Sequence, residues 1–223
     1  MRSQLAALAV FFLFYASAFA TTLEVPDQYA TIQAAMDDAL AGDTVLVAPG
    51  TYDDVTHEAP GSDTTKCVVI MKSGVILRGS GSDQTIIDPL HQGRGIHCEG
   101  VSDATIIEDL GVTNAFAQVY AAGILCRDGS SPVIQRCDVS GNDDGGIICL
   151  FDSSPTIREC TINNNVAKQG GGLAIENDCS PLVTLCQING NQSPSGGGVL
   201  VRAGSTPLFV ECEIAMNEID APN

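Results

Sequence analysis

Tryptophan is absent from this sequence, aromatic residues make up only 5%, and just 10 lysines and arginines stand against 27 aspartates and glutamates. The resulting net charge of −17 repels phosphate backbones, which excludes nucleic acid as a partner. The scarcity of aromatic rings also weakens the case for a platform that stacks sugars. The acidic surface is compatible with Ca²⁺ capture, but solubility explains it more simply, and we expect no required cofactor.

Long apolar runs are also missing, except for one near the start. Leu5 to Ala16 are apolar, follow the basic Arg2 and precede an A-x-A site. This pattern predicts a secretory signal peptide over residues 1–20, cleaved after Ala20, and the run is too short to span a membrane. We therefore expect a secreted or cell-surface chain with no transmembrane segment and enough length for one sizeable core.

What the sequence does contain is a repeat. The stretch SPVIQRCDVSGN at 131–142 returns as SPTIRECTINNN at 154–165, and the pattern occurs twice more, with periods of 23, 26 and 26 residues. Each proline is followed by a cysteine at +5, an aliphatic residue at +7 and an asparagine at +10, and is preceded by a glycine at −9. These residues are Pro132, Pro155, Pro181 and Pro207; Cys137, Cys160, Cys186 and Cys212; Val139, Ile162, Ile188 and Ile214; Asn142, Asn165, Asn191 and Asn217; and Gly123, Gly146, Gly172 and Gly198. Such a period predicts a solenoid.

Each repeat is predicted to form one coil with two strand-like runs, one led by the glycine and one that ends in cysteine-x-aliphatic. The cysteine and the aliphatic side chain point inward together, because side chains alternate along a strand. The asparagines lie where the chain turns. We expect their amides to hydrogen-bond along the row and to the backbone of the turn.

Nine cysteines in an exported chain suggest disulfides, but their positions argue against this pairing. The four repeated cysteines form one row, and Cys98, Cys126 and Cys149 form a second. Neighbouring coils lie about 4.8 Å apart, whereas the Cβ atoms of a disulfide lie ~3.8 Å apart. Both rows are therefore predicted to be reduced thiols that fill the core, and collinear ligands do not suit zinc. Cys67 and Cys179 lie outside the rows, and their partners stay open.

The segment before the coils is predicted to cap the open end of the solenoid. This N-terminal cap covers residues 21–60, the coils cover 61–219, and a tail covers 220–223. The cap region contains a helix over about 28–41, a strand from Thr44 to Ala48 and a polar loop from Asp53 to Lys66. Because the sequence stops directly after a repeat, we expect the chain to be incomplete or to continue into a partner.

A leucine-rich repeat is the alternative solenoid. The residues Ile134, Cys137, Val139 and Asn142 fit its L-x-x-L-x-L-x-x-N core. That fold continues into a helical or extended outer segment, whereas here paired glycines, which are poor helix formers, begin another strand. The repeat therefore favours coils built from strands.

The organisation resembles the right-handed parallel β-helix, or pectin lyase-like, superfamily, in its bacterial secreted and surface members. The resemblance covers nearly all of residues 22–219 and depends on the segments VPDQYATIQAAMDDALAGDTVLVAPGTY, SGVILRGSGSDQTIID, GGGLAIEN and GGGVLVR. It implies an all-β, right-handed parallel β-helix with a short N-terminal capping helix. It also implies action on or near polysaccharides but no particular reaction, since lyases, hydrolases, esterases, epimerases and non-catalytic surface proteins share the fold.

The candidate catalytic residues are Arg136, Asp138, Glu159, Asp143 and Asp144. The first three are predicted on the outward face of the cysteine-bearing strand. An enzyme resembling the pectate lyases would need such acids for Ca²⁺ and an arginine to take the proton next to the uronate. Asp143 and Asp144 adjoin a turn and would serve a hydrolase as paired carboxylates. A solvated ladder of mixed charge and ordinary turn residues explain the same positions more simply.

The histidines offer no site, because His57 and His91 lie in predicted polar loops and alternation points His97 outward. One outward row of the glycine-led strand is apolar, so either a segment of the chain or a partner covers it. That row is Leu125, Ile148, Ala174 and Leu200.

These patterns favour a secreted β-helix repeat protein that acts as a non-catalytic surface module and contacts extracellular polysaccharide or another surface protein. The alternative is a polysaccharide lyase or glycoside hydrolase that acts on uronate-containing polysaccharide.

Overall fold

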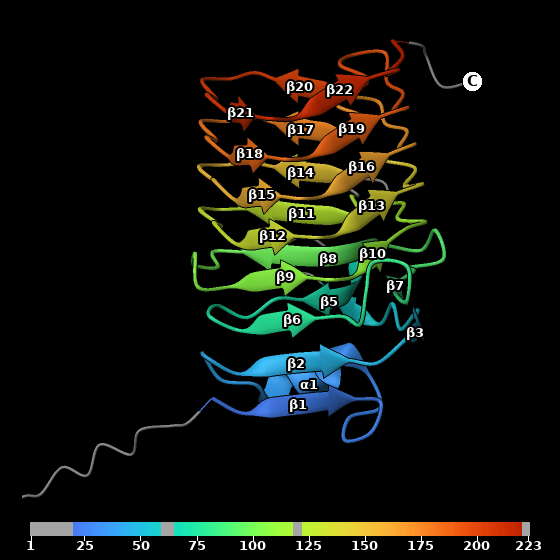
Figure 1. Ribbon diagram of the computed structural model, residues 1–223, viewed down its shortest axis with the longest axis vertical. Coiled ribbons are helices and arrows are strands. Elements are labelled where there is room, and N and C mark those ends of the chain that lie inside the picture. Colours follow the sequence, from blue (N-terminus) through green and yellow to red (C-terminus); the bar gives the residue numbers. More distant parts are fainter. Residues whose placement is uncertain (1–19, 59–64, 118–121, 220–223) are drawn as a thin grey trace, which may run out of the picture.

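The computed structural model describes residues 20–58, 65–117 and 122–219, which form a column of stacked coils (Figure 1). It is a right-handed parallel β-helix of about 7 turns with a single short helix, so the fold class predicted from the repeat is confirmed. The predicted signal peptide, apart from Ala20, and the predicted tail lie outside the described residues. Within the described ranges, no helix is both long enough and apolar enough to cross a membrane.

From β6 to β20, each coil contributes one strand to each of three sheets. Sheet A contains β1 (Thr22–Val25), β2 (Thr44–Val47), β6 (Ile76–Arg78), β9 (Ile106–Glu108), β12 (Val133–Gln135), β15 (Thr156–Arg158), β18 (Leu182–Thr184) and β21 (Leu208–Val210). Sheet B contains β3 (Gly50–Tyr52), β7 (Thr85–Ile87), β10 (Gly111–Val112), β13 (Asp138–Ser140), β16 (Thr161–Asn163), β19 (Gln187–Asn189) and β22 (Glu213–Ala215). Sheet C contains β4 (His57–Glu58), β5 (Lys66–Ile70), β8 (Arg94–Glu99), β11 (Ile124–Arg127), β14 (Ile147–Cys149), β17 (Leu173–Ile175) and β20 (Val199–Val201). Neighbouring strands are parallel, with β4 and β5 as the antiparallel pair.

Each regular coil has three strands, whereas the sequence predicted two. The run that ends in cysteine-x-aliphatic breaks into a strand of sheet A and a strand of sheet B, and the corner residue between them has positive φ. These corner residues are Asp109 (57°), Arg136 (51°), Glu159 (54°), Leu185 (55°) and Glu211 (53°). The left-handed conformation turns the chain while both flanking strands keep their ladder bonds. Arginine, glutamate and leucine are not the residues that usually adopt this conformation, so no residue type marks the corner in these coils.

The N-terminal segment has a shorter helix and more strands than predicted. The helix α1 spans Ile32–Asp38 rather than 28–41, because Ala39 is already extended, with ψ 144°. Thr31 caps its start by accepting a hydrogen bond from Ala34 N at 3.2 Å. Leu40, inside the predicted helix, lies beyond the end of α1 and is 62% exposed. Gly50 is the start of β3, and β4 lies inside the predicted polar loop.

The cysteines lie inside the column as free thiols. All nine are reduced, eight are buried, and Cys212 in the last coil is partly exposed. Thiols of the repeated row reach the carbonyl oxygens of the preceding coil, with Cys137 Sγ 3.7 Å from Ile107 O and Cys160 Sγ 3.6 Å from Ile134 O. Cys67 and Cys179, whose partners the sequence left open, are also buried, and their Sγ atoms donate to Thr65 O and Asn177 O, each at 3.8 Å.

The asparagine amides form a continuous column. Each Nδ2 donates to the Oδ1 of the next coil, at 2.9 Å from Asn142 to Asn165 and at 3.0 Å from Asn165 to Asn191 and from Asn191 to Asn217. The second amide proton goes to a backbone carbonyl, as from Asn191 to Ile162 O at 2.8 Å. The repeated glycine faces this column. A Cβ at Gly172 would lie 2.8 Å from Asn191 Nδ2 and 2.5 Å from Gly198 O, so any side chain there would collide.

The apolar outer row of sheet C is covered by the chain itself. Leu125, Ile148 and Ala174 are buried and belong to a second apolar cluster with Ala122 and Leu150. Glycine-rich loops lie against this cluster, since a Cβ at Gly170 would lie 2.6 Å from Ala174 Cβ and one at Gly145 would lie 3.8 Å from Ile148 Cγ1. Of the two explanations that the sequence left open, the covering segment is therefore the one in the structure. Leu200, in the last coil, is partly exposed.

Candidate functional site

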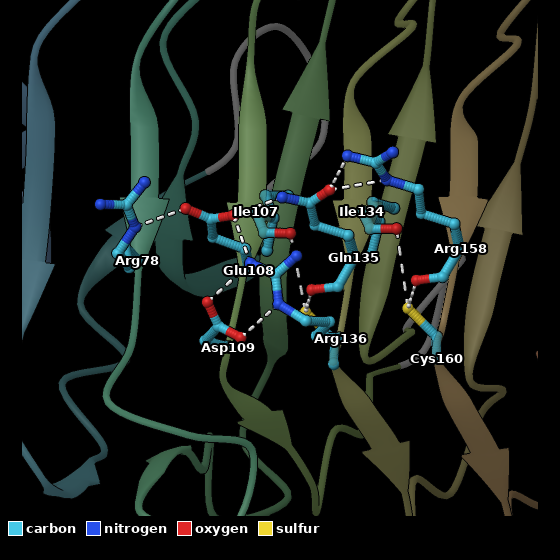
Figure 2. A network of polar contacts seen from close by, with 10 residues as sticks. Arg78, Ile107, Glu108, Asp109, Ile134, Gln135, Arg136, Arg158 and Cys160 are labelled. Atoms are coloured by element: carbon cyan, nitrogen blue, oxygen red, sulfur yellow. Dashed lines mark hydrogen bonds and ion pairs between the residues drawn. The ribbon is translucent and has the colours of Figure 1, made fainter.

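A row of polar side chains crosses the outer face of sheet A (Figure 2). It occupies the last position of four neighbouring strands that pair in register, from β6 to β15. The position before it faces the core and is fully buried in each strand, so alternation directs the last position outward. We use the name polar row for Arg78, Glu108, Gln135 and Arg158 together with the adjoining corner pair Asp109 and Arg136.

Glu108 is the centre of the polar row. Its side chain is 4% exposed and accepts hydrogen bonds from Arg78 Nε, from Gln135 Nε2 and, at 2.7 Å, from Arg136 Nη2. Burial would raise the pKa of this carboxyl, but the hydrogen bonds from Gln135, Arg78 and Arg136 together outweigh burial, and the pKa lies below its ordinary value. Glu108 is therefore a charged and fully engaged carboxylate at neutral pH, which does not suit a general acid.

Arg136 holds the corner between sheets A and B. Its Nε lies 2.7 Å from Asp109 Oδ1 and its Nη2 lies 2.8 Å from Asp109 Oδ2, a paired contact that matches the fork of the guanidinium to the carboxylate. The hydrogen bond from Arg136 is the main cause of the lowered pKa of Asp109. The same contact raises the pKa of Arg136. Arg136 is thus neutralised by two acids of the preceding coil.

Arg158 differs from Arg136 because its hydrogen-bond partner is the side-chain amide of Gln135 and not a carboxylate. Its Nε donates to Gln135 Oε1 at 2.7 Å, and its Nη2 donates to the same oxygen. Its side chain is exposed, and among the described residues no carboxylate forms an ion pair with it. At the other end of the row, Figure 2 shows the terminal nitrogens of Arg78 directed away from Glu108. The row therefore presents guanidinium N–H groups to solvent at both ends.

The polar row continues into apolar surface on either side. Leu46 precedes Arg78 in register and lines a hollow of about 250 Å³ with Val25, Ala48, Pro49, Ser80, Glu24 and Asp27. Beyond Arg158, the strands β18 and β21 expose Leu182 (38%), Leu208 (58%) and Val210 (40%). On the outer face of sheet A, the polar row therefore lies between two stretches that contain apolar side chains.

The predicted catalytic residues do not come together. Arg136 lies at the corner and pairs with Glu108 and Asp109, neither of which the sequence singled out. Asp138 bonds its own strand neighbour Ser140, and Glu159 is the exposed corner residue of the next coil. Asp143 pairs with His91 at 2.9 Å on the far side of β13, and Asp144 follows it. In the described part of the chain, no three histidine, cysteine or acidic side chains gather to hold a metal ion.

His97 corrects another expectation. Alternation does point it outward from β8, but it is fully buried, and its Nε2 lies 3.1 Å from Glu99 Oε2. The residue beside it in register is Leu125 of the covered apolar cluster. The prediction of a surface histidine was wrong because the sequence did not reveal that this outer face is covered.

The members of the polar row other than Arg136 were missed. A signal for them existed, since Gln135 and Arg158 occupy the position three residues after the repeated prolines, between two apolar stations. Aligning the earlier coils would have placed Arg78 and Glu108 at the same position. Those coils lack the proline, so only the strand register shows the correspondence.

Comparisons with known proteins agree with this architecture. Residues 61–219 match the family model described as "Right handed beta helix region". No curated protein matches the sequence. Among solved structures, the chain is similar to the pectate lyase Pel9A at 17% identity and a TM-score of 0.54, over 72% of this chain and 43% of the lyase, so it spans less than half of the lyase's length. It also aligns with the pectin methylesterase from Aspergillus niger at 15% identity and a TM-score of 0.47, over 93% of this chain and 89% of the esterase.

Proposed function

The chain belongs to the family of right-handed β-helix proteins, and from that fold we propose that it is a secreted, non-catalytic module that binds acidic polysaccharide across the outer face of sheet A. The observation that carries this proposal is the polar row. In a chain of net charge −17, three arginines gather on one face, and Arg158 is held there by an amide instead of an acid. Guanidinium groups bind carboxylates through paired N–H donors, so this face suits a polymer that carries carboxylates.

The spacing of the arginines supports a polymer laid along the column. Arg78 and Arg158 lie three coils apart, on the order of 14 Å at about 4.8 Å per coil. Arg136 belongs to the coil between Glu108 and Arg158. A chain of uronate units parallel to the axis would meet Arg78 and Arg158 in turn. No metal is required, because the arginines supply the positive charge.

Location outside the cell is part of the same proposal. The predicted signal peptide supports export of the chain, and an exported module meets extracellular polysaccharide directly. The bacterial secreted and surface proteins that the sequence resembles support it as well.

The test is binding of the purified protein to polygalacturonate, with a neutral glucan as the comparison polymer. We expect polygalacturonate alone to bind, and to bind more weakly as salt is added, because salt screens exposed charges. Arg158→Gln should weaken binding about tenfold, the loss of one charge-assisted hydrogen bond. Lys168→Gln removes the same charge from a loop over sheet C and should change nothing. Equal losses in both variants, or equal binding of both polymers, would contradict the proposal.

The catalytic alternative, a polysaccharide lyase or glycoside hydrolase, depends on Asp143. Its carboxylate lies 2.9 Å from His91 Nδ1, and histidine is the side chain that most often serves in acid–base catalysis. The protein should be incubated with uronate polymers with and without Ca²⁺ while unsaturated products and new reducing ends are followed. Turnover that disappears in Asp143→Asn or Arg136→Ala would replace the binding function with this one.

A further inference from the structure

The asparagine column contains the chain's one N-glycosylation acceptor sequence, Asn191-Gln192-Ser193. The N-x-[ST] pattern is ordinarily modified where it lies in a surface loop of an exported protein. Here the acceptor asparagine is a repeat station of the fold. Glycosylation requires that the Asn191 amide be exposed, whereas the fold requires that it be buried.

Both hydrogens of the Asn191 amide are already used. Nδ2 donates to Ile162 O at 2.8 Å and to Asn217 Oδ1 at 3.0 Å. Oδ1 accepts from the backbone N and the Nδ2 of Asn165, at 2.9 and 3.0 Å. N-glycosylation joins Nδ2 to the first sugar carbon, breaks the bond from that carbon to the pyrophosphate of a lipid-linked oligosaccharide donor and removes one amide proton. A glycosylated Asn191 would thus lose one of its two donated bonds.

The surroundings also leave no space for a sugar. Asn191 and Ser193 are both 0% exposed. A single Cβ added at Gly172 would already lie 2.8 Å from Asn191 Nδ2. The hydroxyl that the modifying enzyme must recognise is occupied as well, because Ser193 Oγ donates to Ser195 O at 3.0 Å and accepts from Ser195 N at 3.1 Å.

We propose that glycosylation of Asn191 and folding of the β-helix exclude each other. The unfolded chain exposes Asn191 as an acceptor, and a glycan attached there prevents the coil from closing on Asn165 and Asn217. Once the coil has closed, the amide is out of reach. In a secretory pathway that glycosylates asparagine, the sequence therefore acts as a branch point between folding and modification.

The test is expression of the exported chain in eukaryotic cells, followed by separation of the secreted, protease-resistant fraction from the retained, protease-sensitive fraction. Peptide mass spectrometry then measures the glycan at Asn191 in each fraction. Ser193→Ala removes the acceptor pattern while keeping the column. Asp138→Asn creates a matched acceptor, because residue 138 lies on the outer face of β13 two positions before Ser140. Both variants and the parent are also made in bacteria, where their folding is compared without glycosylation.

We expect glycan at position 138 in the folded Asp138→Asn protein and none at Asn191 in any folded fraction. Glycan at Asn191 should appear in the retained fraction, and Ser193→Ala should raise the folded yield in eukaryotic cells but not in bacteria. A parent chain with no glycan at Asn191 in either fraction, while position 138 is occupied, would contradict the proposal, since the unfolded chain would then not act as an acceptor at Asn191. A folded, protease-resistant protein that carries a glycan at Asn191 would overturn it.

Discussion

At the scale of single residues, the asparagine column shows why one residue type recurs at one station. Asparagine carries two donors and an acceptor on a short side chain, so it can bond the copy above, the copy below and the turn backbone at once. Aspartate would place like charges in a buried row, and glutamine would reach past its neighbour. The column leaves the amides at its interior fully paired.

Removing one amide from the middle of the column should be costly. In a buried setting, Asn165→Ala leaves the backbone N–H and one Nδ2 hydrogen of Asn142 without their acceptor, and it removes the amide donor to Val139 O and one of the two donors to Asn191 Oδ1. Each unpaired buried group costs about 1–3 kcal/mol, so the free energy of unfolding should fall by at least about 3 kcal/mol. Urea unfolding followed by circular dichroism measures this. Thr161→Ala, on the outer face of the adjoining strand β16, should change stability by less than about 1 kcal/mol, and similar losses in both would contradict the role of the column.

Glu108 should make the free energy of unfolding depend on pH in the acidic range. Its pKa is lower in the folded protein than in the unfolded chain, where glutamate titrates near ~4.3. Its contribution is therefore complete above that unfolded value and disappears as pH falls through the lower folded pKa. Glu108→Gln should lower the free energy of unfolding in urea at pH 7 by about 2 kcal/mol, because charged hydrogen bonds are lost, and the difference from the parent should shrink below pH 4. A difference that stays constant from pH 7 to pH 3 would show that Glu108 acts by packing alone.

At the scale of elements, the corner between sheets A and B is the least predictable part of the coil. Non-glycine residues there take a left-handed conformation, and in each coil the flanking strands continue their ladders on both sides of the bend. The ladder hydrogen bonds on both sides hold the corner in its left-handed conformation, so the chain tolerates residues there that do not favour this conformation. Local preference is thus overruled by pairing along the column.

Leu185 marks a corner at which stability can be gained. It has φ 55°, is 52% exposed and keeps its backbone bond to Val210 O at 3.0 Å. Asparagine adopts this conformation more readily, so Leu185→Asn should increase the free energy of unfolding by about 1 kcal/mol and raise the melting temperature. Leu182→Asn replaces a similarly exposed leucine inside strand β18 and should lower it. If calorimetry shows a lower melting temperature for both variants, the corner is not strained.

At the scale of the whole molecule, each coil contacts only its neighbours, so opening should begin at an end of the column. The reactivity of the thiols can reveal the order in which the coils open, because four cysteines lie at the same position of successive coils. The hydrogen bond that the Cys160 thiol donates to Cys137 is the main cause of the raised pKa of Cys160, and the bond that the Cys186 thiol donates to Cys160 plays the same part for the pKa of Cys186. Buried, protonated thiols react slowly.

Thiol labelling should therefore follow the order of the coils. In the native protein, Cys212 should react with a thiol reagent first, followed by Cys186, Cys160 and Cys137, while denaturant should expose all nine at once. Mass spectrometry of labelled peptides over time gives the order. Simultaneous labelling of the four positions would show that the column opens as one cooperative unit.

The sequence by itself determined the solenoid, the inward rows and the amide column, because stacking places each residue on its own copy and makes the period of the sequence the period of the structure. Only the tertiary structure decided the third strand of each coil, the burial of His97 and the assembly of the polar row. Those features depend on contacts between coils whose residues are not copies of one another. Glu108 meets Arg78 and Arg136, 30 and 28 positions away, and nothing local to any of the three residues encodes that meeting.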